Sequence, residues 1–280
     1  PGDEVIYHEP CFVSYRPTIV MAGGVPVCVE TRREDDFRLT RAMLEKAVTP
    51  KTRVLMLNFP CNPTGAVLGR KDVEDIADFC VKHDLLLLTD EIYAELTYDA
   101  KHVSFVSMPG MPERTIFLHG MSKAWAMTGF RIGYACAPAE ISENMMKLHQ
   151  YAIMSAPTTG QKAAAEALER GDEAVAAMVA EYNRRRNYLI AAFADMGVSC
   201  HTPAGAFYAF PYIGDLGLSS EDFAMRLLEQ KNVAAVPGDA FGKSGAGFLR
   251  CAYATGMDNI REAMKRMAEF VAEIRAEKKK

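Results

Sequence analysis

The sequence predicts an α/β fold, a doubly wound and mostly parallel sheet followed by a second, smaller α+β domain. Two observations lead to this prediction. Short apolar runs alternate with amphipathic stretches as far as residue 137, as strands and crossover helices do. From residue 138 onward the pattern changes first to long helices and then to short strands mixed with helices. The length of 280 residues, 49% of them hydrophobic, is sufficient for more than one domain.

Each strand expected in the first part is brief, strongly apolar and bounded by Gly, Pro, Asn or Asp, which favour turns. The expected strands cover residues 5–7, 25–29, 53–58, 85–89, 115–118 and 131–135. Helices are expected between them. One covers residues 41–48 behind the N-cap residue Thr40, and another covers residues 71–82, where apolar residues recur at helical spacing.

The second part is predicted to begin with helices at residues 158–169 and 173–196, the latter long enough to bridge two domains. Strands are expected at residues 198–201, 207–212, 233–236 and 248–253. A helix capped by Ser219 or Ser220 and a closing helix from Met257 complete the pattern. We therefore divide the chain into a large domain, residues 1–172, and a small domain, residues 173–280, which includes the interdomain helix.

Composition argues against several classes of partner. The net charge is −4 and the basic residues are spread along the chain, unlike the clustered positive charge of nucleic-acid-binding proteins. No apolar run approaches the length of a membrane span, and the seven cysteines lack the paired spacing of a zinc site or a disulfide framework. We expect a cytoplasmic protein that acts on small molecules, without nucleic acid, membrane or metal ion.

The strongest chemical signal is Lys123, which follows a strand on the small-residue turn formed by Gly120, Met121 and Ser122. A lysine there is poorly placed as a surface charge, and burial lowers an ammonium pKa so that the free amine can attack an aldehyde. Arg131, eight positions later, offers a forked donor suited to a phosphate. Either residue alone would be weak evidence, because lysine and arginine are common in ordinary loops.

The second signal is Asp90, at the end of an apolar strand, with Tyr93 three positions later. Parallel sheets bind ligands at the carboxyl ends of their strands, and a carboxylate there could pair with a protonated ring nitrogen. Tyr93 would place its hydroxyl near the same ring. The alternative is that Asp90 only caps the turn at residues 91–96.

Two further residues are candidate ligand contacts. Asn62 begins the sequence Asn-Pro-Thr-Gly after another strand, where it either contacts a ligand or simply forms a turn. Arg250 lies inside an apolar strand of the second domain. A buried guanidinium without a partner is costly, so Arg250 must pair with a protein carboxylate or with the carboxylate of a ligand.

Taken in order, these motifs resemble the class I and II aminotransferases, the pyridoxal-phosphate (PLP) enzymes related to aspartate aminotransferase. The resemblance covers nearly the whole chain, and the ordered set is far more specific than any one motif. It includes Gly2-Asp3-Glu4, Ala22-Gly23-Gly24, Asn62-Pro63-Thr64-Gly65, Asp90-Glu91-Ile92-Tyr93, Ser122-Lys123, Thr128-Gly129-Phe130-Arg131, Gly205-Ala206-Phe207-Tyr208 and Leu249-Arg250. The resemblance implies fold type I of the PLP-dependent transferases, PLP as cofactor and a homodimer.

The resemblance also implies roles for three catalytic residues. Lys123 holds PLP through a Schiff base and, once released by the substrate, moves the proton between the substrate Cα and the cofactor. Asp90 keeps the pyridine nitrogen protonated, so that the ring withdraws electrons. Tyr93, together with Asn62, donates hydrogen bonds to the phenolic oxygen of the ring.

The remaining site residues are assigned from the same resemblance. Phe12 corresponds to the aromatic residue that stacks on the cofactor ring, and Arg131 corresponds to the arginine that binds the phosphate. Asn62 and Arg250 are expected to bind the substrate, Arg250 corresponding to the arginine that binds the substrate α-carboxylate as a bidentate pair.

The sequence departs from the family pattern in two places. Many relatives have a serine where this chain has Gly120, so that contact with the phosphate is either lost or moved to Ser122. The chain also starts at Pro1, without a methionine, and enters a strand at once, which suggests that an N-terminal segment is missing. In the family that segment carries a phosphate-binding turn and a tyrosine donated across the dimer, and we expect weaker PLP binding without it.

Three functions remain open. The leading hypothesis is an aminotransferase that moves an amino group from an L-amino acid to a 2-oxo acid by a ping-pong mechanism. The segment at residues 9–15 resembles the multi-substrate branch, so the donor is expected to be aromatic, aspartate-like or broad in range. The first alternative is a PLP-dependent carbon–sulfur lyase of the same fold. The second is the aminotransferase-like sensor domain of a transcription regulator, which a DNA-binding segment upstream would identify.

Overall fold

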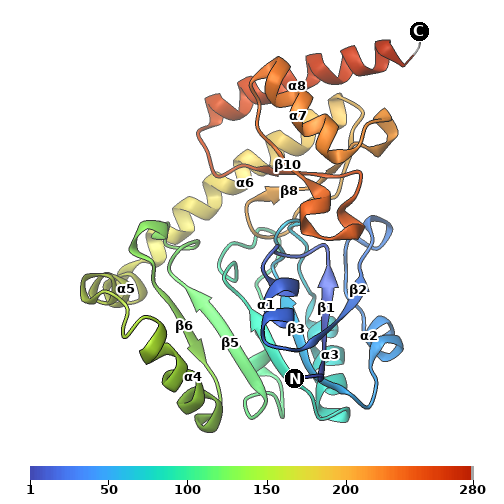
Figure 1. Cartoon of the computed structure of the whole chain (residues 1–280). Coiled ribbons are helices and arrows are strands. Elements are labelled where there is room, and N and C mark those ends of the chain that lie inside the picture. The colour runs from blue at the N-terminus through green and yellow to red at the C-terminus, as the bar shows by residue number, and fades with distance from the viewer. Residues whose placement is uncertain (279–280) are drawn as a thin grey trace.

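A six-stranded sheet organises the first half of the chain in the computed structural model, which describes residues 1–278 (Figure 1). The strand order is β2–β1–β3–β4–β5–β6. The strands are β1 (Glu4–Glu9), β2 (Val25–Glu30), β3 (Thr52–Asn58), β4 (Leu86–Asp90), β5 (Thr115–Gly120) and β6 (Gly133–Cys136). Every neighbouring pair is parallel except β5 with β6, which is antiparallel. The predicted mostly parallel sheet is therefore confirmed.

Helices cover both faces of this sheet, as a doubly wound fold requires (Figure 1). In the view of Figure 1, α1 (Tyr15–Met21) lies in front of the sheet and α3 (Arg70–Lys82) lies behind it, with α2 (Arg41–Ala47) packed against α3. The apolar face predicted for α3 is buried, and it consists of Val73, Ile76, Ala77 and Cys80. Burial of this face, rather than intrinsic helix propensity, stabilises a helix of this length.

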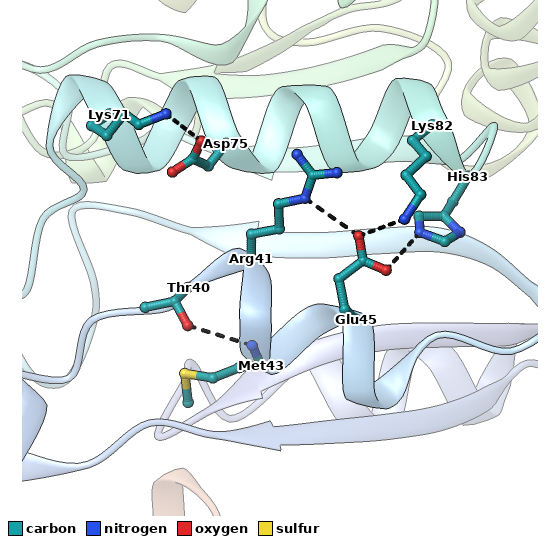
Figure 2. A network of polar contacts seen from close by, with 8 residues as sticks. All are labelled: Thr40, Arg41, Met43, Glu45, Lys71, Asp75, Lys82 and His83. Carbon is teal, nitrogen blue, oxygen red and sulfur yellow. Dashed lines mark hydrogen bonds and ion pairs between the residues drawn. The ribbon is translucent and has the colours of Figure 1, made fainter.

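Polar contacts join α2 and α3 at the surface (Figure 2). The Thr40 hydroxyl accepts a hydrogen bond from the amide of Met43, which confirms the predicted N-cap of α2. Glu45 accepts hydrogen bonds from Lys82, His83 and Arg41 at 3.0, 3.0 and 3.3 Å. Lys82, followed by the other two donors, lowers the pKa of Glu45 to about 2. Exposed pairs of this kind contribute little individually, so the apolar contact carries most of the packing.

The second half of the chain leaves the sheet through α4 (Ala139–Ala152), α5 (Thr158–Arg170) and the 24-residue helix α6 (Asp172–Asp195). In Figure 1, α6 runs from the sheet to the C-terminal unit. That unit contains β7 (Ser199–Cys200), β8 (Tyr208–Ala209), β9 (Pro211–Tyr212), α7 (Ser220–Lys231), β10 (Val236–Pro237), β11 (Leu249–Ala252) and α8 (Met257–Glu277). Within residues 1–278, no helix combines the length and apolar character of a membrane span.

The apolar residues form two large cores. One joins the sheet to α3, and the other fills the space between α6, α7 and α8. Three phenylalanines of the C-terminal unit nevertheless belong to the first core, namely Phe210, Phe241 and Phe248. Phe210 stacks on Phe248 with ring centroids 4.8 Å apart, and both rings meet the edge of Phe37. The division at residues 172 and 173 stays a prediction, and residues 279 and 280 of the proposed small domain lie outside the described part.

Several elements differ from the sequence prediction. The strand expected at residues 131–135 begins only at Gly133, because Arg131 adopts a left-handed conformation with φ of 57°. The strand expected at residues 207–212 is divided into β8 and β9, since Phe210 turns its buried side chain into the large core. Only residues 236 and 237 are strand in the region of the predicted 233–236 strand. Helix α1 was not predicted, and Pro17 in its first turn obscures the helical pattern.

The aromatic contact between Phe210, Phe248 and Phe37 predicts a large loss of stability when it is removed. Phe210 is fully buried, so Phe210→Ala should lower the free energy of unfolding by about 3–5 kcal/mol. Urea denaturation followed by circular dichroism measures this change. Phe130→Ala is the matched control, because Phe130 is 47% exposed and its truncation should cost less than about 1 kcal/mol. Equal losses in the two variants would contradict the prediction.

Candidate active site

All eight residues predicted for the site line one cavity of about 310 Å³. It lies at the carboxyl ends of β1, β3, β4 and β5, where the strand order reverses direction around β1 and where open parallel sheets bind ligands. The predicted residues in its wall are Phe12, Asn62, Asp90, Tyr93, Ser122, Lys123, Arg131 and Arg250. Residues that are up to 238 positions apart in the chain are thus brought together by the fold.

Lys123 occupies the turn that follows β5 and is half-buried. Its ammonium nitrogen lies 5.7 Å from the ring centroid of Phe207 and 5.9 Å from that of Tyr93. Burial lowers the pKa of Lys123, and the positive charges of Arg250 and Arg131 lower it further, against a smaller opposing effect of Asp90. The environment therefore increases the fraction of free amine, the form that attacks an aldehyde.

Asp90 is the last residue of β4, and its carboxylate has two protein donors. The hydroxyl of Tyr15 donates to Oδ2 at 2.7 Å, and the amide of Ile92 donates to Oδ1 at 3.1 Å. Burial raises the pKa of Asp90, and these two hydrogen bonds oppose the rise. The turn-capping alternative is therefore correct as far as the Ile92 contact goes, but the same carboxyl group also lines the cavity.

Two tyrosine hydroxyls meet beside the cavity. The hydroxyls of Tyr93 and Tyr208 are 3.0 Å apart, and one donates to the other. Burial raises the pKa of Tyr93 well above its ordinary value, followed by the effect of Tyr208. Tyr93 is therefore a neutral phenol, able to donate a hydrogen bond.

Asn62 begins the predicted turn, which the amide of Gly65 closes by donating to the carbonyl of Cys61 at 2.9 Å, and it also lines the cavity. Its backbone amide donates to Oδ1 of Asn58 at 3.1 Å, and the Asn58 side-chain amide donates to the carbonyl of Asp90 at 2.9 Å. The side-chain oxygen of Asn62 accepts a hydrogen bond from Nη1 of Arg250 at 3.1 Å. The ends of β3 and β4 are thus connected through Asn58 and Asn62 to the arginine from the C-terminal unit.

Arg250 projects from β11 between two aromatic rings. Its guanidinium carbon lies 4.6 Å from the ring centroid of Tyr208 and 4.9 Å from that of Phe241. Nε is buried without a hydrogen-bond partner, and no carboxylate in residues 1–278 forms an ion pair with this side chain. Of the two partners considered from the sequence, a protein carboxylate is therefore excluded within the described part of the chain.

The other wall of the cavity carries Arg131, Ser122 and Phe12. Arg131 is exposed, and its Nη1 donates to the carbonyl of Thr128 at 2.9 Å. It forms no ion pair with a carboxylate in the part of the chain that the structure describes. Phe12 is 38% exposed, and its ring meets the edge of Tyr15 with centroids 5.7 Å apart. This wall therefore offers a free cation, a hydroxyl and an exposed aromatic ring.

Close packing of β5 against β6 explains the glycine at position 120. A Cβ atom there would lie 2.9 Å from the carbonyl oxygen of Ile132 and 3.0 Å from the Cα atom of Gly133. Both neighbours are backbone atoms and cannot move aside without shifting the strand. A serine at position 120 would therefore not fit this backbone, and Ser122 is the hydroxyl that lines the cavity.

The sequence analysis missed four polar residues of the cavity, namely Tyr15, Asn58, Thr128 and Tyr208. Tyr15 lies three positions after Phe12, and Tyr208 closes the motif at residues 205–208. Neither position by itself indicates a contact with Asp90 or Tyr93. Only the packing of α1 and β8 against the strand ends creates these hydrogen bonds.

The donor set of the cavity fits PLP. The cofactor has an aldehyde, a basic ring nitrogen, a planar aromatic ring and a phosphate. The cavity has an amine with a lowered pKa, a buried carboxyl group, an exposed aromatic ring and a cation that no carboxylate pairs with in residues 1–278.

The raised pKa of Asp90 predicts a pH-dependent effect of Asp90→Asn on the cofactor-free protein. A carboxyl group whose pKa is raised by folding stabilises the protein at low pH, and this contribution is lost as the pH rises through the folded-state pKa. The free energy of unfolding of Asp90→Asn, relative to the original protein, should therefore increase from about pH 4 toward neutrality. Urea denaturation at a series of pH values measures it. A difference in the free energy of unfolding that is constant with pH would contradict a raised pKa of Asp90.

Comparisons with known proteins agree with this geometry. Residues 1–267 match the family model described as aminotransferase class I and II. An aspartate aminotransferase from Pyrococcus abyssi and an aromatic-amino-acid aminotransferase from Thermococcus litoralis are each 48% identical over 275 residues, which is 97% of this chain and 71% of each relative.

A solved structure of an aromatic aminotransferase from Pyrococcus horikoshii superimposes with a TM-score of 0.95 at 49% identity, covering 97% of this chain and 73% of that one. An aspartate aminotransferase from Thermus thermophilus, solved with maleate, has a TM-score of 0.90 at 40% identity, covering 96% and 70%. The fold is thus fold type I of the PLP-dependent transferases. The chain belongs to the class I and II aminotransferases, a family of PLP-dependent enzymes.

Proposed function

We propose that this cavity binds PLP and transfers an amino group from an L-amino acid to a 2-oxo acid in two half-reactions. The observation that carries the proposal is the convergence of Lys123, Asp90, Arg131 and Arg250 on one cavity. The amine would bind the aldehyde and the acid would pair with the ring nitrogen. One cation would bind the phosphate and the other the substrate carboxylate. The names of the relatives support an aspartate-like or aromatic donor, or a broad range that includes both.

When bound, PLP supplies an aldehyde that captures amines and a conjugated ring that withdraws electrons from the substrate Cα. In this proposal the amine of Lys123 would hold PLP and would move the proton at the substrate Cα. Asp90 keeps a proton on the ring nitrogen, and Tyr15 and Ile92 hold its carboxylate in place.

The other residues bind and orient. Arg131 and Ser122 bind the phosphate, and Phe12 covers the ring face. Asn62 and Tyr93 donate hydrogen bonds to the phenolic oxygen. A homodimer, a cytoplasmic location and a domain boundary at residue 172 stay predictions from the sequence.

Arg250 binds the substrate α-carboxylate in this proposal. The two aromatic rings and Asn62 hold its guanidinium, and its buried Nε has no partner in the described chain. A carboxylate would supply that missing acceptor, and a bidentate pair is the strongest arrangement for it. The amino acid and the 2-oxo acid both carry this carboxylate, so one arginine serves both half-reactions.

Substitution of Lys123 tests the proposal most directly. Lys123→Ala should abolish covalent fixation of the cofactor by borohydride and reduce transamination by at least about a thousandfold, because the variant lacks the amine and the proton carrier. Mass spectrometry after reduction measures the fixation, and 2-oxoglutarate-dependent product formation measures activity. The exposed lysine of α5, in Lys162→Ala, is the matched control and should leave both unchanged. Wild-type activity in Lys123→Ala would refute the mechanism.

Arg250→Lys tests the substrate carboxylate site. The variant keeps the positive charge but loses the forked donor, so kcat/KM for the amino acid should fall by about a hundredfold. The affinity for PLP, followed by absorbance titration, should remain close to that of the original protein. A fall in PLP affinity with unchanged KM would place Arg250 at the cofactor instead.

Product analysis separates the aminotransferase from the carbon–sulfur lyase. With L-aspartate or L-tyrosine as donor, we expect product only when a 2-oxo acid is present. Release of ammonia and a thiol from L-cystathionine, independent of any 2-oxo acid, would support the lyase instead.

A further inference from the structure

Glu9 is a buried carboxylate that no cation pairs with in residues 1–278. It is the last residue of β1 and only 7% exposed. The hydroxyl of Tyr7 donates to Oε1 at 2.8 Å, and the backbone amide of Lys243 donates to Oε2 at 2.9 Å. A buried charge held only by neutral donors is costly, so this side chain is not explained by a stabilising ion pair.

The backbone around Gly242 is shaped to receive this carboxylate. Gly242 has φ of 115° and ψ of 167°, a combination that is available essentially only to glycine. A Cβ atom at this position would lie 2.2 Å from Cδ of Glu9. Gly242 and the amide of Lys243 therefore make room for the Glu9 carboxylate and bind it. The glycine-rich segment at residues 238–247 folds into two short 3-10 helices, Gly238–Phe241 and Lys243–Gly245.

The same segment carries one of the two rings that hold Arg250. Phe241 immediately precedes Gly242, is 2% exposed, and lies under the guanidinium at 4.9 Å. Its carbonyl accepts a hydrogen bond from the amide of Cys11 at 3.0 Å. The end of β1 and the residues after it thus contact the segment that holds Arg250 at two adjacent points, through the Glu9 side chain and the Cys11 backbone.

We propose that Glu9 is a positioning residue for substrate binding. It holds residues 241–243, and Phe241 in turn fixes the position of the Arg250 guanidinium. This inference rests on the proposed role of Arg250 and adds a residue that has no contact with substrate or cofactor. The side chain of Glu9 accepts hydrogen bonds from Tyr7 and Lys243, and Glu9 does not line the cavity itself.

The PLP-loaded Glu9→Ala variant tests this inference. KM for L-aspartate or L-tyrosine and KM for 2-oxoglutarate should both rise about tenfold, since both substrates use Arg250. The kcat and the dissociation constant for PLP should stay within about twofold of the original values, because Lys123, Asp90 and Arg131 are unchanged. Unchanged KM values, or an equal loss of kcat, PLP affinity and thermal stability, would overturn the inference.

Three further variants sharpen the result. Glu9→Gln keeps an acceptor for the Lys243 amide and should hold KM within about threefold of the original value. Glu9→Asp keeps the carboxylate but shortens the side chain by one methylene, and it should also raise KM. This variant provides the test if Glu9→Ala does not fold. Glu30→Ala is the matched control, because Glu30 is the register partner of Glu9 at the end of β2 and is exposed. A rise in KM in the Glu30 variant equal to that in Glu9→Ala would overturn the inference.

Arg250→Lys, measured in parallel, separates the two proposals. If Arg250→Lys leaves KM unchanged, the proposed substrate site is wrong and the inference falls with it. If Arg250→Lys raises KM and both Glu9→Ala and Glu9→Asp do not, the site stands and only the positioning role of Glu9 is wrong.

Discussion

The parallel alignment of β1, β3, β4 and β5 is the constraint on which the site depends. Each of these strands ends at the same edge of the sheet, and the chain that follows each one contributes a side chain to the cavity. The carboxyl group comes from β4 and the amine from the turn after β5. Because strand spacing and direction are set by backbone hydrogen bonds, these groups are positioned before any ligand arrives.

Burial acts in opposite directions on the two central ionisable groups. Desolvation penalises charge, so it lowers the pKa of Lys123 and raises that of Asp90. Two cations reinforce the effect on the lysine, whereas hydrogen bonds from Tyr15 and Ile92 moderate the effect on the aspartate. One shared environment thus favours the neutral amine of Lys123 and makes the carboxylate of Asp90 a stronger base. Two neighbouring groups whose pKa values are shifted in opposite directions are typical of sites for acid and base chemistry.

The C-terminal unit is part of the site and of the large core. Arg250 reaches the cavity from β11, where Asn62 accepts its hydrogen bond and the rings of Tyr208 and Phe241 lie beside its guanidinium. Phe210 and Phe248 pack into the apolar core under the sheet, which limits how far the two units can separate. Movement of the C-terminal unit would therefore move the arginine relative to the amine, and contacts such as that of Glu9 with Lys243 control this geometry.

The sequence by itself predicted the sheet, most helices and the eight residues proposed for the site. Apolar strands and helical periodicity are local signals and were sufficient for the elements, whereas Phe12 and the roles of the site residues followed from the resemblance of the ordered motifs to a family. Tertiary structure alone decided the contacts of Asp90 with Tyr15, of Tyr93 with Tyr208, and of Glu9 with the turn at Gly242. It also decided the left-handed conformation of Arg131 and the exclusion of a side chain at position 120. These features join residues distant in the chain, or depend on backbone clearance, and no local pattern encodes either.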